Sequence, residues 1–162
     1  MKFSIIFIIL TVFFVSQAMG AGSSSVAPSV EKDIKYYNKG VELMLDKKFA
    51  RAEKQFRKSL KQNESFAEAH NNLAYTLRKQ GAAYFDEALK HYNRAIQLNP
   101  ALPEPFMYRG VLHVQMGNRD LALADHQTLL AMNPGLADEL EYVISNGREK
   151  EPEQFFGVST RK

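Results

Sequence analysis

The sequence predicts an all-α fold in which three antiparallel helix hairpins stack as a solenoid and a C-terminal helix caps the stack. Two series of small residues indicate this fold. One series recurs at intervals of 34 and 36 residues, at Gly40, Ala74 and Gly110. The other recurs at intervals of 36 and 34 residues, at Ala52, Ala88 and Ala122. A period of about 34 residues with two helical segments per unit is typical of helix-hairpin solenoids.

The spacing places six repeat helices near residues 33–45, 49–62, 66–79, 85–98, 103–116 and 119–132. Short polar turns at 46–48 and 117–118 suit helix hairpins, whereas residues 81–85 lengthen the turn of the second hairpin. Proline suits a first helical turn and disrupts a helix interior. Pro100 and Pro134, which are 34 residues apart, therefore open new units. Glu64 stands at the matching place in the first junction, where Asn63 or Ser65 is expected to cap the next helix.

Each unit also carries a bulky residue four positions before its first small residue. These pairs are Tyr36 with Gly40, His70 with Ala74, and Phe106 with Gly110. Residues four apart share one helix face, so the small residue lets the second helix of the hairpin approach closely. Residues 136–145 predict a seventh helix, with its apolar side chains facing inward and Asn146 and Gly147 ending it.

These residues resemble the tetratricopeptide repeat family from about residue 34 to residue 134. The segments "EAHNNLAYTL", "FDEALKHYNRAIQLNP" and "MYRGVLHVQMGNRDLALADHQTLLAMNP" keep that family's spacing of small, aromatic and proline positions. The departures are Glu64 for proline, Ser59 and Leu129 for alanine, and His126 for an aromatic residue. The resemblance implies a right-handed solenoid of three repeats, at about 33–65, 66–101 and 102–135, with the capping helix at 136–146. The repeat domain would span residues 32–146.

The N-terminus has the three-part layout of a secretory signal peptide at residues 1–20. Lys2 precedes an almost wholly apolar run at residues 3–15, and small residues follow, with cleavage expected after Ala18 or Gly20. The apolar run is shorter than the roughly 20 residues that span a bilayer comfortably. An uncleaved membrane anchor is the alternative. Residues 21–31 read as a flexible spacer, and residues 147–162 as a charged, disordered tail.

The formal net charge of +3 is unevenly distributed. Residues 31–62 carry ten Lys or Arg against five Asp or Glu, whereas residues from 63 onward carry ten against thirteen. The basic first repeat could serve an acidic partner or an anionic lipid surface. It could equally be the solvated face of two amphipathic helices, or one end of a head-to-tail self-association.

The resemblance implies that the first helices of successive hairpins line a concave groove that binds a peptide. The groove-facing positions would be free of the hairpins' own core. The alternative is that, with only three repeats, some of them cover the capping helix or a neighbouring hairpin. The candidate groove residues are Tyr37, Val41, Met44, Asn71, Asn72, Tyr75, Arg78, Met107 and Val111. They describe an apolar trough with a polar, basic middle, suited to a segment with apolar anchors and one carboxylate.

A subset of this family clamps the C-terminal carboxylates of chaperones with a set of Lys, Asn and Arg side chains. The matching positions here hold Tyr37 and Val41, then Asn72, then Glu104 and Tyr108. Of these residues, Asn72 alone fits the pattern. Without the cations the sequence does not predict that clamp.

Catalytic and metal-binding patterns are missing from the sequence. The histidines His70, His91, His113 and His126 lack metal-binding helical spacing, and three of them occupy packing positions. No Gly-rich phosphate loop, GxSxG or His-Glu-x-x-His motif occurs. The chain has no cysteine, so disulfides contribute nothing to its stability. The modest charge and the export signal disfavour nucleic-acid binding.

The sequence therefore predicts a non-catalytic, cofactor-free, exported interaction module, secreted or periplasmic, that holds a partner segment in its groove. A membrane-tethered scaffold is the alternative. Phe155 and Phe156 stand out in the charged tail. They would fold back on the domain, form a short docking motif, or have no role.

Overall fold

The computed structural model describes residues 28–151, and every regular element in that range is a helix. The seven α-helices are α1 (Pro28–Leu45), α2 (Phe49–Gln62), α3 (Ala67–Gln80), α4 (Phe85–Leu98), α5 (Glu104–Gln115), α6 (Arg119–Met132) and α7 (Pro134–Asn146). A short 3₁₀ helix, η1 (Ala82–Tyr84), lengthens the turn between α3 and α4. The predicted all-α solenoid of three hairpins and a capping helix is confirmed.

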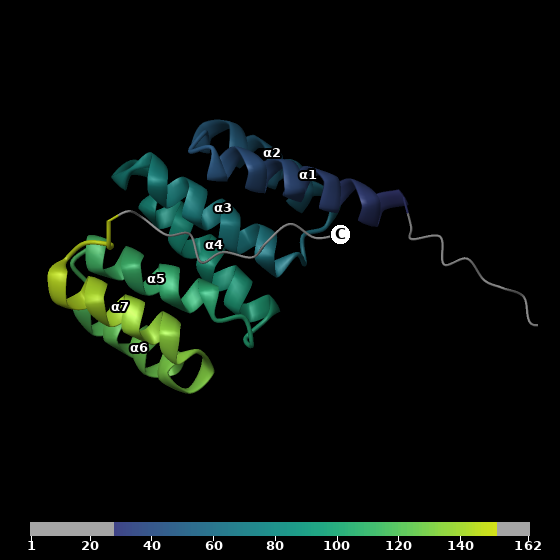
Figure 1. Ribbon diagram of the computed structural model, residues 1–162. Coiled ribbons are helices and arrows are strands. Elements are labelled where there is room, and N and C mark those ends of the chain that lie inside the picture. Colours follow the sequence, from purple (N-terminus) through teal and green to yellow (C-terminus); the bar gives the residue numbers. More distant parts are fainter. Residues whose placement is uncertain (1–27, 152–162) are drawn as a thin grey trace, which may run out of the picture.

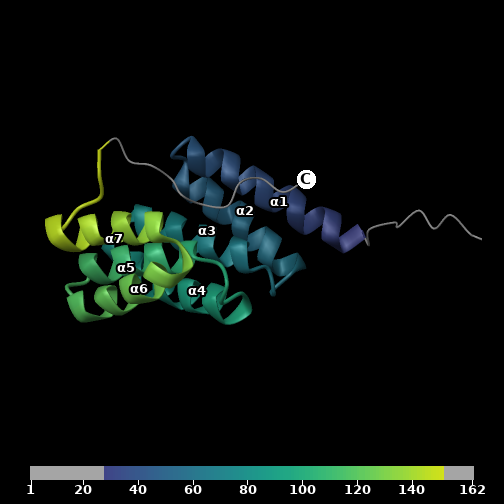
Figure 2. The same ribbon diagram turned by 60° about the horizontal axis from the view of Figure 1, so that its bottom comes forward.

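The helices form two layers (Figure 1). Helices α1, α3, α5 and α7 lie in the front layer of that view, and α2, α4 and α6 lie behind them. Each hairpin pairs one helix of each layer, and Figure 2 shows the stack from below. The odd-numbered helices therefore line one common face, which we call the concave face.

The first helix begins earlier than expected. It starts at Pro28, so the last residues of the predicted 21–31 spacer are helical. Proline fits this position because N–H groups in the first turn of a helix make no intrahelical hydrogen bond, so the N–H that proline lacks is not needed. The predicted signal peptide, most of the predicted spacer and the Phe155–Phe156 pair lie outside the described residues.

Helix boundaries follow the turn chemistry. Asn133 caps α7 by accepting a hydrogen bond from the Leu136 backbone N–H at 3.2 Å, and Pro134 occupies the first turn. Gly147 ends that helix in the left-handed region, at φ 71°. The expected cap of α3 is wrong in detail, because its N-cap residue is Phe66 and no side chain caps it. Asn63 Oδ1 instead accepts from the Ser65 N–H one turn upstream, at 3.1 Å.

The two glycines of the first series let helices approach closely, as predicted. At Gly110, however, the approaching helix is not the expected second helix of the hairpin. A Cβ added to Gly40 would lie 2.6 Å from Cε1 of Phe56 on α2. At Gly110 the added Cβ would instead meet Leu140 of the capping helix α7. The third repeat therefore uses its glycine to accept the cap rather than its own second helix.

Arg109 bridges three helices. From α5 it donates two hydrogen bonds to Asp125 on α6, at 3.1 and 2.5 Å, and one to Asn93 on α4, at 2.7 Å. Asp125 is nearly fully buried. A buried carboxylate needs such a partner to offset its desolvation. The bridge thus fixes the third hairpin against the second.

Within residues 28–151, no helix combines the length and apolar character needed to cross a bilayer.

Candidate functional site

All nine predicted groove residues lie on the odd-numbered helices, but their side chains are buried. None is more than 5% exposed. Val41, Met44, Met107 and Val111 belong to the hydrophobic core. For these apolar residues the expectation that groove positions are free of the core is wrong, because their side chains pack with those of neighbouring helices. Their part in binding a peptide stays a prediction.

Aromatic rings fill the junctions between hairpins on this face. The ring of Tyr37 lies 4.7 Å from that of Phe66, and the ring of Tyr75 lies 5.0 Å from that of Tyr108 in an edge-on arrangement. Phe49 meets Tyr75 at 6.3 Å. Contacts between aromatic rings stabilise a fold beyond the burial of the rings' apolar surface. These tyrosines therefore build the walls of the concave face rather than project from it.

The two asparagines of α3 have different roles. Asn72 donates from Nδ2 to the Tyr37 hydroxyl at 3.0 Å, so it is engaged within the domain. Asn71 donates to Asn72 Oδ1 at 3.1 Å. Its own Oδ1 is buried and accepts no hydrogen bond from the described residues. A buried acceptor without a donor is costly, and a ligand backbone N–H would satisfy it.

Arg78 forms an anion site at the C-terminal end of α3. Its side chain has no exposed surface, and its guanidinium lies 5.3 Å from the ring centroid of Tyr75 and 5.8 Å from that of Tyr108. It donates two hydrogen bonds to the Glu149 carboxylate, at 2.9 and 3.0 Å. This fork geometry is specific for carboxylate-like groups.

The electrostatics of Arg78 follow from this setting. Burial alone would lower the pKa of its guanidinium, but the neighbouring Tyr92 and the Glu149 carboxylate raise it above the usual value. The side chain therefore stays charged and needs an anion. The sequence predicted a cation here for one carboxylate contact, but it did not identify Glu149, which lies 71 residues away. Residues 147–151 of the tail expected to be disordered are placed against the domain by this contact.

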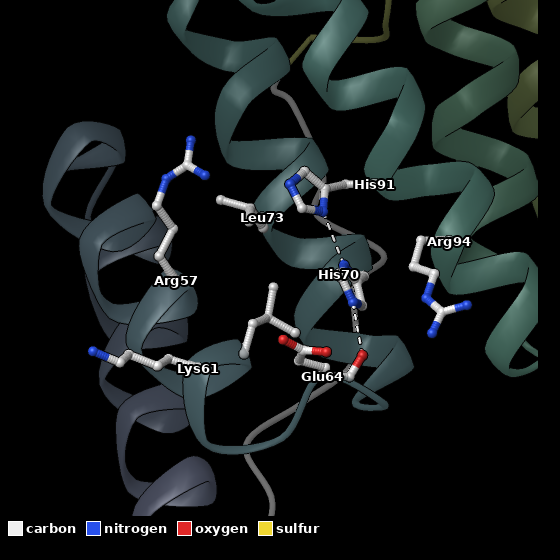
Figure 3. Close-up of a pocket in the computed structure, with 8 residues that line it drawn as sticks. Arg57, Lys61, Glu64, His70, Leu73, His91 and Arg94 are labelled. Atoms are coloured by element: carbon white, nitrogen blue, oxygen red, sulfur yellow. Dashed lines mark hydrogen bonds between the residues drawn. The ribbon is translucent and has the colours of Figure 1, made fainter.

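A second hollow of about 420 Å³ lies between α2, α3 and α4, away from the concave face (Figure 3). Arg57 and Lys61 lie on one side of it, Arg94 on the other, and the rings of His70 and His91 between them. Arg57 already pairs with Glu53 and Glu87, at 2.9 and 2.8 Å. Those two carboxylates compensate the charge of Arg57.

The histidine pair in this hollow was not foreseen from the sequence. Nδ1 of His70 and Nδ1 of His91 are 2.8 Å apart, and Nε2 of His70 lies 3.1 Å from the Glu64 carbonyl oxygen. Because a carbonyl can only accept, His70 donates from Nε2 to Glu64; in the neutral ring its Nδ1 is then an acceptor, and His91 donates from Nδ1.

Burial lowers the pKa of both histidines, and for His91 the neighbouring His70 adds to the effect and brings its pKa to about 4. The spacing of 21 residues gave no signal for this pair. Register within the repeats would have placed both rings in one junction. Within residues 28–151, the histidine pair included, no group of three or more metal-binding side chains comes together.

Comparison with known proteins agrees with this geometry. The TPR repeat family model matches residues 85–117, which span α4 and α5. No curated protein sequence matches the chain.

Solved structures of TPR domains share the fold. The TPR domain of OM64 from Arabidopsis is 18% identical, with a TM-score of 0.67 over 74% of this chain and 99% of that one. The second TPR domain of human RPAP3, in complex with the HSP70 peptide SGPTIEEVD, is 22% identical, with a TM-score of 0.66 over 73% and 98%. PcrH, in complex with the chaperone binding region of PopD, is 17% identical, with a TM-score of 0.62 over 68% and 86%.

Proposed function

We propose that the chain is a tetratricopeptide-repeat protein that binds a peptide segment of a partner protein on its concave face, without catalysis. The observation that carries this proposal is the buried guanidinium of Arg78, which is held between aromatic rings and bound to a carboxylate. A buried cation is expensive unless an anion satisfies it. Such a site is suited to reading an acidic side chain.

Structurally similar domains support binding of this kind. The RPAP3 domain is solved with an HSP70 peptide, and PcrH with a region of PopD. The partner of this chain is expected to differ from peptides held by a two-carboxylate clamp. Tyr37, Glu104 and Tyr108 stand where that clamp needs cations, and none of these three side chains can carry a positive charge. The domain therefore offers one strong carboxylate site in place of a clamp.

The groove also suggests how the ligand backbone would be held. Asn71 Oδ1 is a buried acceptor on the same helix face as Arg78, two turns away. An extended segment could place a carboxylate at Arg78 and a backbone N–H at Asn71. The apolar and aromatic walls would then receive hydrophobic side chains between and beyond these two points.

Partner capture with matched variants tests the proposal. Arg78→Met and Asn71→Leu, made together, remove the polar groups with little change in volume. Arg57→Met and Lys61→Met, made together, are the control, because they remove two cations from the other hollow. Each chain would be crosslinked in its native cells and its partners identified. We expect one partner to be lost with the groove variant and retained with the control. If both variants still capture that partner, the concave face is excluded as its binding site.

We further propose that the protein acts outside the cytoplasm, in the periplasm or as a secreted protein. The support is the order of basic, apolar and small residues over positions 1–20. The alternative is a membrane-tethered scaffold that keeps this segment. The mass of the N-terminus of the native protein separates the two. A chain beginning near residue 19 or 21 supports export with cleavage, and an intact Met1 supports the tethered form.

A further inference from the structure

Helix α3 is buried on every face. All twelve residues from Ala67 to Arg78 are buried, including the polar Glu68 and Asn71. In a two-layer stack, a front-layer helix is covered behind by the second layer and on its flanks by its neighbours. Its concave face should remain open to solvent. It does not, and the packing of the repeat helices alone does not account for this burial.

The described chain leads towards this face. Beyond α7, Glu149 reaches Arg78 with two hydrogen bonds and lies 3.8 Å from Nζ of Lys79. Lys150 pairs with Glu139 of α7 at 2.7 Å and lies 5.1 Å from the ring centroid of Tyr142. Figure 1 shows the chain leaving α7 and turning towards the ends of α3 and α5. It therefore reaches the mouth of the groove with residues 152–162 still to come.

We propose that residues 152–162 dock in the concave groove of the same molecule, with Phe155 and Phe156 as apolar anchors, and that a partner peptide must displace them. This inference rests on the proposed function, because it assigns an occupant and a regulator to the same groove. The Arg78–Glu149 contact would be its fixed end.

The length of the segment fits. From Arg78 to Glu68, α3 is about 15 Å long at 1.5 Å per residue. An extended chain covers roughly 3.3 Å per residue, so Phe155 can lie about 20 Å beyond Glu149. The two phenylalanines would then reach the N-terminal half of α3. The buried acceptor of Asn71 and the Tyr37–Phe66 ring pair lie in that half.

The order of charges fits as well. The segment is acidic at its start, with Glu149, Glu151 and Glu153, and basic at its end, with Arg161 and Lys162. The groove is basic where the chain enters, at Arg78 and Lys79. Towards the opposite ends of α3 and α5 it is acidic, with Glu68 and Glu104 in the first turns. One oxygen of Glu104 is buried and accepts no hydrogen bond from the described residues.

A docked segment in the same chain would weaken partner binding. Short tethers give effective concentrations on the order of millimolar. If the dissociation constant of the segment is about tenfold below this effective concentration, the segment lowers the apparent affinity of a competing peptide by about tenfold. A partner peptide would then have to compete with this segment for the same groove.

A spin label tests the placement in the full chain. The sequence has no cysteine, so Ser159→Cys gives a single attachment point. We expect the label to broaden backbone amide signals of α1, α3 and α5, and this broadening to be lost when Phe155→Ala and Phe156→Ala are added. Broadening confined to α2, α4 and α6, or unchanged by the two substitutions, would overturn the proposal.

A peptide titration tests the competition. The probe is a fluorescent peptide copying residues 147–162, added to full chains. It should bind the Phe155→Ala, Phe156→Ala chain about tenfold more tightly than the unmodified chain. Glu149→Gln should also tighten binding of the probe, whereas Glu151→Gln, which removes an exposed carboxylate, should not.

Equal binding of the probe to all four chains, or binding to none, would refute docking in the same chain. Neither result would touch the proposed function, because partner capture with the Arg78 and Asn71 variants is measured separately. Circular dichroism of each variant checks that the helices are retained.

Discussion

The close approach of α1 and α2 at Gly40 makes a quantitative prediction. A Cβ at this position would lie 2.6, 2.7 and 2.9 Å from three atoms of the Phe56 ring. The ring is fully buried and lies 5.9 Å from that of Tyr37, so it has little room to move. Overpacking of this kind costs about 1–3 kcal/mol. Alanine gains about 1 kcal/mol over glycine within a helix, so we expect Gly40→Ala to lower the free energy of unfolding by up to about 2 kcal/mol.

The sign should reverse once the ring is removed. Phe56→Ala alone should cost about 3–5 kcal/mol. In that background the added methyl group meets no ring, so Gly40→Ala should raise the free energy of unfolding by up to about 1 kcal/mol. Urea unfolding of the four chains should give a coupling of about 1–3 kcal/mol between the two sites. Equal effects of Gly40→Ala in both backgrounds would refute the close-approach explanation.

Three further predictions concern the described contacts. Arg109→Met should lower the free energy of unfolding by about 3 kcal/mol, because it leaves the Asp125 carboxylate buried without its cation; urea unfolding measures this loss. His91 has a folded-state pKa of about 4, below its ordinary value of 6.5, so stability should be full above pH 6.5 and fall as the pH drops towards 4. Replacing His91 by Asn should flatten that fall in a pH series of thermal unfolding, and an unchanged profile would contradict the assignment. Gly147→Ala should cost about 1 kcal/mol, because the residue ends α7 with φ of 71°, and a gain in stability would show that the strain argument is wrong.

The sequence predicted the repeat helices closely because turn residues and small residues mark them. The bounds of α2, α4 and α6 agree with the expected 49–62, 85–98 and 119–132. The start of α1 was missed because residues 28–31 lack apolar periodicity. There the helix depends on Pro28 in its first turn and on continuity with the amphipathic part that follows.

The candidate site could be located on the concave face but not described in detail. Register assigned Tyr37 and Met107 to the groove, yet the same register cannot tell a wall residue from a projecting one, since both face the same side of a helix. Burial decided between them. The Arg78–Glu149 and His70–His91 contacts join residues 71 and 21 positions apart, and no local pattern encodes such distances.

The central claim is that the concave face binds the partner. Hydrogen exchange of the full chain, with and without the partner peptide recovered by capture, tests it most directly. The account predicts added protection along α1, α3 and α5 and little change around the His70–His91 hollow. Protection confined to α2, α4 and α6, with the concave helices unchanged, would contradict it.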